Sequence, residues 1–416
     1  MSKLIINGGK KLNGEIKIQG AKNSVLPIIA ASILGNGQSI IENCPYLSDT
    51  DSAGEILKVL GCDVKRENET LIIDSSSFNT FEIPEYLMRK MRSSIMFLGA
   101  ILGRARKAKI SLPGGCELGP RPIDLHLASL AKLGVKIYDE YGFLNCECPN
   151  DLKGAEISLS FPSVGVTENV MLAATLAKGT TTIMNAAKEP EIEDLQTFIN
   201  HMGGKIRGAG TDIIEIEGVK SLNPSRHVVI PDRIAAATYI IAVYATGGKG
   251  RIINVNPSHL LSVISALTDA GCNLNWGNNY IEIKESAKLR GLKVRTMPYP
   301  GFPTDIQAPF MALMSIAEGT SVFIETIFEN RFKHVDELTR MGAKIRVEGR
   351  VAVIEGVKRL SGAAVEATDL RGGAALAIAG LTAEGQTEID KIFHIDRGYD
   401  KIEEKLSAMG ALIKRV

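Results

Sequence analysis

The chain has 416 residues and a net charge of +1, from 48 basic and 47 acidic side chains. A charge this close to zero gives no strong field for nucleic acid or an anionic membrane, so neither is expected as a partner. The longest apolar stretch, residues 234–245, is far shorter than the roughly 20 residues of a membrane-spanning helix. Six cysteines without paired spacing favour free thiols, and residues 1–9 lack the apolar core of a signal peptide. We therefore expect a cytoplasmic protein.

A pattern of amphipathic helix, glycine and short strand recurs six times along the chain. The glycines that end these helices are spaced 68 to 73 residues apart and are Gly61, Gly134, Gly203, Gly271, Gly342 and Gly410. A period of this length determines the architecture, and six such units fill the sequence. Cys62 and Cys272 directly follow two of these glycines, where they are expected to be small buried residues.

Each unit contains a second helix that is apolar on all sides and is therefore expected in the core. These helices are predicted at residues 24–34, 90–102, 167–178, 233–246, 305–318 and 370–384. A glycine suited to a left-handed helix C-cap follows each of them, at positions 35, 103, 179, 247, 319 and 385. Alternating segments such as 343–347 and 351–354 predict a β-hairpin after the amphipathic helix. The unit is therefore strand, helix, strand, helix, strand, strand.

Three units can surround three buried helices, so six units predict an α/β (α+β) protein of two domains, at about 100 to 200 residues per domain. The sixth unit ends at Val416 before its hairpin is complete, and the strand-like residues 1–20 are expected to complete it. The predicted domains are residues 21–229, and residues 1–20 with 230–416. Two crossings of the chain would form a hinge, and hinges commonly close a cleft, where we expect the active site.

The most unusual segment is residues 112–126, in which three glycines and three prolines stand close together. Such a loop has a defined shape, and Cys116 within it lies near the fixed charge of Arg121, a setting that makes a thiol reactive. Pro122 suits the start of a helix, whose first turn would contain Asp124. The alternative is an ordinary surface cysteine. We favour the functional interpretation because nothing in the repeat requires this loop.

Charged residues also stand at the starts of the buried helices. Lys22 and Asn23 precede the first, Asp305 opens the fifth, and Asp369 with Arg371 opens the sixth. Helix N-termini gathered in one cleft would bind an anion. Asp305 has two equally supported interpretations: a residue that favours the helix dipole next to an N-cap at Thr304, or a general base.

A single arginine is usually a solvated surface charge, and we favour that interpretation for Arg92 when it is considered by itself. Arg331 and Arg397 stand where repeat-related helices begin, which makes a functional role as plausible as a structural one. The six histidines are never at metal-ligand spacing, and no Walker A or Rossmann motif is present. We expect no metal and no cofactor.

Several blocks together resemble the UDP-N-acetylglucosamine enolpyruvyl transferases (UDP-N-acetylglucosamine 1-carboxyvinyltransferases), and the resemblance spans the whole chain. The blocks are residues 20–23, 113–126, 302–305, 328–332 and 394–399. The resemblance implies two inside-out α/β barrels, each of three repeats, in a bacterial cytoplasmic enzyme. It also implies transfer of the enolpyruvyl group of phosphoenolpyruvate to the 3-hydroxyl of UDP-N-acetylglucosamine with release of phosphate. That reaction is the first committed step of peptidoglycan synthesis, and so of cell-wall formation, cell shape and division.

The resemblance further implies roles for single residues. Lys22, Arg121 and Arg397 would bind the phosphate and carboxylate of phosphoenolpyruvate. Cys116 would protonate its methylene carbon, and Asp305 would take the proton of the attacking hydroxyl. The remaining expected substrate-binding residues are Asn23, Arg92, Pro122, Ile123, Asp124, Leu125, Ser163, Val164, Gly165, Ile327, Arg331, Asp369 and Arg371.

Where some relatives carry a lysine shortly before the Ser-Val-Gly segment, this chain has Phe161 and Pro162, which puts one diphosphate contact in doubt. Two other functions stay open: a shikimate-pathway enolpyruvyl transferase, and a non-catalytic paralogue that binds the nucleotide sugar and a protein partner. The sequence does not reveal the oligomeric state, for which a monomer is favoured.

Overall fold

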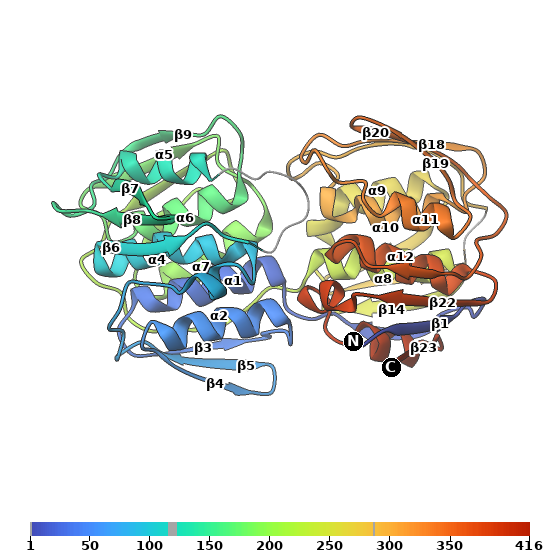
Figure 1. Ribbon diagram of the computed structural model, residues 1–416, viewed down its shortest axis with the longest axis horizontal. Coiled ribbons are helices and arrows are strands. Elements are labelled where there is room, and N and C mark those ends of the chain that lie inside the picture. The colour runs from blue at the N-terminus through green and yellow to red at the C-terminus, as the bar shows by residue number, and fades with distance from the viewer. Residues whose placement is uncertain (1, 115–122, 286–287) are drawn as a thin grey trace. The chain divides into compact units, whose positions relative to one another are not determined.

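The computed structural model describes residues 2–114, 123–285 and 288–416. Contacts within the chain divide them into two compact units (Figure 1). One unit contains residues 20–114 and 123–230, and the other contains residues 2–19, 231–285 and 288–416. We call them the 20–230 unit and the 231–416 unit.

The 20–230 unit contains the following helices and strands. The helices are α1 (Lys22–Ala31), η1 (Ser32–Leu34), α2 (Ser48–Val59), α3 (Glu85–Met88), η2 (Arg92–Ile95), α4 (Met96–Ala105), α5 (Asp124–Lys132), α6 (Val164–Ala174) and α7 (Pro190–His201). The strands are β3 (Gln38–Glu42), β4 (Asp63–Glu67), β5 (Thr70–Asp74), β6 (Lys107–Ser111), β7 (Lys136–Glu140), β8 (Phe143–Glu147), β9 (Glu156–Ser158), β10 (Thr180–Met184), β11 (Lys205–Arg207), β12 (Ile213–Glu217) and β13 (Arg226–Val228).

The 231–416 unit repeats this order of elements. Its helices are α8 (Arg233–Ala245), η3 (Pro257–Leu260), α9 (Leu261–Asp269), α10 (Thr304–Met314), α11 (Val335–Arg340), α12 (Leu370–Thr382), η4 (Ile392–Arg397) and α13 (Ile402–Ala408). Its strands are β1 (Leu4–Asn7), β2 (Asn13–Lys17), β14 (Lys249–Ile253), β15 (Asn273–Trp276), β16 (Tyr280–Lys284), β17 (Lys293–Arg295), β18 (Thr320–Ile324), β19 (Lys344–Glu348), β20 (Val351–Glu355), β21 (Ala364–Glu366), β22 (Gln386–Asp390) and β23 (Leu412–Arg415).

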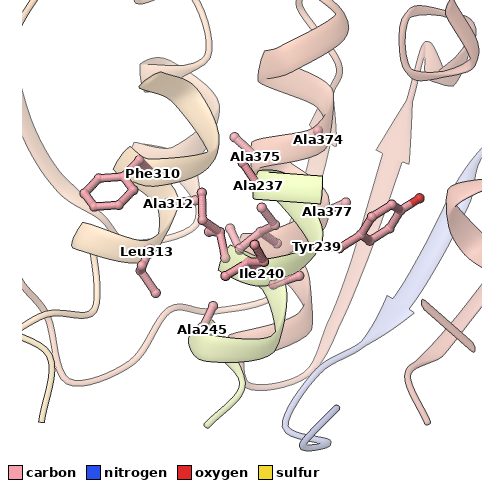
Figure 2. Packing of buried hydrophobic residues seen from close by; sticks show 14 of the residues in the cluster. Ala237, Tyr239, Ile240, Ala245, Phe310, Ala312, Leu313, Ala374, Ala375 and Ala377 are labelled. Carbon is pink, nitrogen blue, oxygen red and sulfur yellow. The ribbon is translucent and has the colours of Figure 1, made fainter. Parts of the chain in front are cut away.

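The predicted inside-out architecture is confirmed in each unit. The apolar helices α1, α4 and α6 form the core of the 20–230 unit, and α8, α10 and α12 form that of the 231–416 unit. Their small residues allow close approach of the backbones, and Figure 2 shows Ala237, Ala312 and Ala375 in this packing. The sheets and the amphipathic helices surround these cores.

Among the described residues, five of the six sheets share one topology, and the sheet β6-β8-β7 has its antiparallel part alone. The sheet β17-β18-β20-β19 is typical, with a parallel pair, β17 and β18, followed by the antiparallel hairpin of β19 and β20. The hairpin predicted at residues 343–347 and 351–354 is therefore confirmed. Strand β1 pairs with β22 and β23, and β2 runs parallel to β14, so the N-terminal strands complete sheets of the 231–416 unit.

The six repeat glycines all adopt left-handed backbone angles, with φ between 92° and 99°. Glycines 179, 247, 319 and 385 after the buried helices do so as well. The prediction was wrong for Gly35, whose φ is −84°, and for Gly103, which lies inside α4; Arg106 supplies the left-handed C-cap there. A Cβ at Gly103 would lie 3.0 Å from the carbonyl oxygen of Leu172, so close packing of α4 on α6 explains that glycine.

Within residues 2–114, 123–285 and 288–416, no helix combines the length and apolar character needed to cross a membrane. The same residues contain no group of three His, Cys, Asp or Glu side chains placed to hold a metal ion.

Candidate active site

Asp305 lies in the first turn of α10, and two arginines hold its carboxylate. Oδ1 accepts from Arg331 Nη2 at 2.9 Å, and Oδ2 accepts from Arg371 Nε at 3.1 Å and from Nη2 at 2.9 Å. Both arginine side chains are 3% exposed, whereas that of Asp305 is 28% exposed. The two guanidinium groups stabilise the charged carboxylate and leave part of it open to a ligand.

Arg371 is fixed at the start of α12. Asp369 caps this helix, with Oδ1 accepting from the backbone N–H groups of Arg371 at 3.0 Å and Gly372 at 3.1 Å. Burial alone would raise the pKa of Asp369, but the charge of Arg331 and these hydrogen bonds lower it. The Arg371 guanidinium lies 5.3 Å from the centre of the Tyr399 ring. Burial would lower the pKa of Arg371, yet Tyr399 and Asp305 raise it, so this cation stays charged.

Arg331 joins the loop after β18 to the start of α10. In addition to Asp305, its Nη2 donates to the backbone oxygen of Thr304 at 3.2 Å. Thr304 was expected to cap α10; instead it is the first residue of the helix, and its hydroxyl donates to Glu325 at 3.0 Å. The N-cap position is Pro303, which has no side chain able to cap.

In the 20–230 unit, Lys22 is the first residue of α1. Its Nζ lies 2.7 Å from Oδ2 of Asp49, and both side chains are more than nine-tenths buried. Asn23, the next residue, is exposed. The positive charge at this helix start is therefore held in place by a buried carboxylate.

The segments expected to bind the nucleotide meet around His126. His126 lies in the first turn of α5, which begins at Asp124 after the N-cap residue Ile123. Its Nδ1 is 2.9 Å from the amide nitrogen of Asn169 in α6. A Cβ at Gly165 would lie 3.3 Å from Cε1 of His126, so the α6 start packs directly on the ring. The structure therefore brings residues 123–125 and 163–165 together.

The charge of Arg92 also affects the pKa of the His126 ring. Burial, with a further contribution from the Arg92 guanidinium, lowers the pKa of His126 to about 4, so the imidazole is neutral at pH 7. Ser163 caps α6 through a hydrogen bond from the Val166 N–H at 3.5 Å. His126 and Asn169 were missed as site-forming residues because their role depends on contacts between helices.

The expected residues divide between the two units. The 20–230 unit holds Lys22, Asn23, Arg92, Ile123, Asp124, Leu125, Ser163, Val164 and Gly165, and the 231–416 unit holds Asp305, Ile327, Arg331, Asp369, Arg371 and Arg397. Cys116, Arg121 and Pro122 lie outside the described residues. Arg397 was expected where a helix begins, but it is the last residue of η4. The Gln19 side chain fixes the turn after it, with Nε2 donating to the Gly398 oxygen at 3.1 Å.

The five described cysteines are all buried: Cys44, Cys62, Cys146, Cys148 and Cys272. Burial raises the pKa of Cys62 to about 11 and those of Cys146 and Cys272 to about 12. Thiols held neutral in this way are poor nucleophiles and poor acids at pH 7. The expectation of buried cysteines at 62 and 272 is confirmed.

Comparison with known proteins shows full-length relatives. Residues 6–406 match the family described as EPSP synthase (3-phosphoshikimate 1-carboxyvinyltransferase). The chain is 54% identical, over 100% of both sequences, to UDP-N-acetylglucosamine 1-carboxyvinyltransferase 2 of Caldanaerobacter subterraneus subsp. tengcongensis. It is 48% identical to UDP-N-acetylglucosamine 1-carboxyvinyltransferase of Trichlorobacter lovleyi, over 100% of this chain and 99% of the relative.

Solved structures agree with these relatives. The enolpyruvyl transferase NikO from Streptomyces tendae superposes with a TM-score of 0.89 at 26% identity, over 100% of this chain and 99% of that one. EPSP synthase from Acinetobacter baumannii has a TM-score of 0.76 at 19% identity, over 100% of both chains, and shows the shared fold alone.

Proposed function

This chain is a member of the enolpyruvyl transferase family, and from that premise we propose that it transfers the enolpyruvyl group of phosphoenolpyruvate to the 3-hydroxyl of UDP-N-acetylglucosamine. The observation that carries the proposal is the identity of 48% to 54%, over at least 99% of each sequence, to proteins named for that nucleotide sugar. The EPSP synthase named above is only 19% identical. We assign the reaction to peptidoglycan synthesis in a bacterial cytoplasm.

The donor is a small molecule with a phosphate and a carboxylate, which requires several cations and helix N-termini. Lys22 at the start of α1 and Arg397 at the end of η4 are proposed to bind these groups, together with Arg121. Buried cations also stabilise the charge that develops on the departing phosphate. Asp124, Ser163 and the backbone around Gly165 are proposed to hold the nucleotide.

The reaction proceeds by addition and elimination. Cys116 donates a proton to the methylene carbon C3, which makes C2 electrophilic, and the sugar oxygen bonds to C2 while Asp305 takes the hydroxyl proton. In the elimination step the Cys116 thiolate takes a proton back from C3 of the tetrahedral ketal, the double bond re-forms, and the bond from C2 to the phosphate oxygen breaks. The products are enolpyruvyl-UDP-N-acetylglucosamine and phosphate, without a metal or cofactor.

The two arginines on Asp305 set a condition on this mechanism. Both stabilise its charged form, so the carboxylate is a weak base toward an unactivated hydroxyl. Proton transfer to Asp305 therefore has to accompany bond formation at an activated C2. Protonation by Cys116 supplies that activation, which is why the two residues are assigned to one addition step.

The proposal is tested by measuring phosphate release with phosphoenolpyruvate and each of two acceptors, UDP-N-acetylglucosamine and shikimate 3-phosphate. We expect release only with the nucleotide sugar, and none with either substrate alone. Release with shikimate 3-phosphate would assign the chain to the other branch of the family. Tight binding of UDP-N-acetylglucosamine without any release would identify a nucleotide-sugar-binding paralogue instead.

A further inference from the structure

Glu325 is a buried carboxylate with four hydrogen-bond donors around it. The residue is 1% exposed. Oε1 accepts from the backbone N–H groups of Ile327 at 2.8 Å and Phe328 at 3.0 Å. Oε2 accepts from the Thr304 hydroxyl and the Gln307 amide, each at 3.0 Å. A charge buried to this extent needs such compensation, and here it receives two donors on each oxygen.

These donors come from two segments that are assigned to the sugar substrate and to the removal of its hydroxyl proton. Thr304 and Gln307 flank Asp305 in the first turn of α10. Ile327, which the family resemblance implies lies near the sugar or the diphosphate, is in the loop that follows β18, and we call this segment the sugar loop. Glu325 therefore ties the proton-accepting helix turn to the backbone of the sugar loop through a single side chain.

The repeat provides a comparison for this position. Glu325 is the first residue after β18. In three of the other sequence repeats, the first residue after the corresponding strand is asparagine, namely Asn43, Asn185 and Asn254. These asparagines have φ values of 54° to 57°. Each donates from Nδ2 to the backbone oxygen that follows the parallel neighbouring strand, at 2.7 to 2.8 Å.

In the unit of Glu325 the next residue performs that structural task. The Thr326 hydroxyl donates to the backbone oxygen of Thr296, which follows the parallel neighbour β17, at 2.6 Å. The Thr326 N–H donates to the Thr296 hydroxyl at 2.9 Å. Because Thr326 satisfies this oxygen, the side chain at position 325 is not needed to join the strands. A larger and charged residue stands there instead, which is the kind of departure from a local rule that marks functional positions.

We infer that Glu325 is a positioning residue for the addition step, which fixes the Asp305 carboxylate relative to the backbone of Ile327 and Phe328. The inference rests on the proposed function, because its purpose is to present the sugar hydroxyl to Asp305. Glu325 is assigned no contact with either substrate, because it is buried and already accepts four hydrogen bonds. Its effect operates through the first turn of α10 and the sugar loop, where a displacement of about 1 Å is enough to slow a reaction by roughly 100-fold.

The test is E325Q, with E329Q as the matched control. Glutamine keeps the size of the side chain but removes its charge. Even if the new NH₂ group turns toward Thr304, whose hydroxyl can rotate to accept, the bonds from Ile327 and Phe328 lose the strengthening that a charged acceptor gives. Glu329 lies in the same loop, but its side chain is 68% exposed and it pairs with Arg350 on the surface. We expect kcat/KM for UDP-N-acetylglucosamine to fall about 10- to 100-fold in E325Q, with little change in KM for phosphoenolpyruvate and no change in E329Q.

A second measurement separates positioning from loss of folding and does not depend on turnover. Amide hydrogen exchange of Ile327 and Phe328 should accelerate in E325Q and stay unchanged in E329Q. Exchange in the other five sequence repeats should be unaffected in both variants. Equal acceleration throughout the 231–416 unit would indicate a general loss of stability and would overturn the inference. Wild-type kinetics together with wild-type exchange in E325Q would overturn it too. If the unmodified protein releases no phosphate with UDP-N-acetylglucosamine, the proposed function fails, and the exchange of these two amides still decides whether Glu325 holds the loop.

Discussion

Acidification is expected to destabilise the 20–230 unit through His126. The ring is 7% exposed, its Nδ1 is matched to the Asn169 NH₂ group, and the Arg92 charge lies nearby. Protonation would place a buried cation against an arginine and turn this nitrogen into a donor that faces a donor. The structure therefore predicts that His126 has to stay neutral for the native packing of α5, α6 and η2.

The size of the effect follows from the two pKa values of this residue. The pKa of His126 is about 4 in the native state, compared with 6.5 when unperturbed. Because the unfolded state then binds the proton more tightly, stability is complete above pH 6.5 and declines as the pH falls toward 4. Each pH unit in that range costs about 1.4 kcal/mol, which gives about 2 kcal/mol at pH 5.

The assay compares urea unfolding of the parent chain and His126→Gln at pH 8, 6.5 and 5. Glutamine can still accept from Asn169 but cannot be protonated. The difference between the two unfolding free energies at each pH removes the contributions of the other titrating groups, which both chains share. The advantage of the parent should shrink by about 2 kcal/mol from pH 8 to 5. A difference between parent and His126→Gln that does not change with pH would refute the reasoning.

Three further outcomes are expected. The family resemblance implies that the epoxide fosfomycin alkylates Cys116. Treatment should therefore give one adduct on the peptide with Cys116, because the five described cysteines are buried, and modification of a different peptide would contradict this. Cys116→Asp should keep some turnover without forming the adduct. Asp305→Asn should lower kcat roughly 100- to 10,000-fold while calorimetry still detects nucleotide-sugar binding; turnover within threefold of the parent would exclude Asp305 as the proton acceptor. Burial, with Glu191 and Glu189 nearby, raises the pKa of Glu168 well above its usual value. Glu168→Gln should therefore stabilise the protein at pH 7.5, by about 1.4 kcal/mol for each unit of that increase, and the gain should vanish near pH 4.5.

The parts of the fold that sequence could predict are those set by local backbone geometry. A helix that ends in a left-handed residue favours glycine, so the six repeat glycines identify six helix ends directly. The same logic failed at Gly35 and Gly103, because their Cβ positions are occupied by distant residues. At Gly35 a Cβ would lie 2.9 Å from Cε of Met202. A glycine required by tertiary packing looks the same in the sequence as one required by φ.

The site divides in a similar way. Asp305 and Arg371 stand at helix starts, where a charged residue is visible in the sequence, and the structure brings them to within 2.9 Å. Their pairing was not predicted, because residues 66 positions apart meet only when α10 and α12 pack together. His126 and Glu325 were not identified either, since each acts through neighbours from other elements.

The repeat nevertheless contains a signal for such residues, at the first position after the second strand of each unit. Three units have asparagine there, whereas the other three have Leu112 after β6, Glu325 after β18 and Lys391 after β22. These three positions begin the segments that carry Cys116, Arg331 and Arg397. Asparagine at this position joins two strands, so a unit that lacks it has to make the join by other means, as Thr326 does. Comparing a repeat with itself therefore locates the segments assigned to chemistry, because those are the units in which the structural rule is broken.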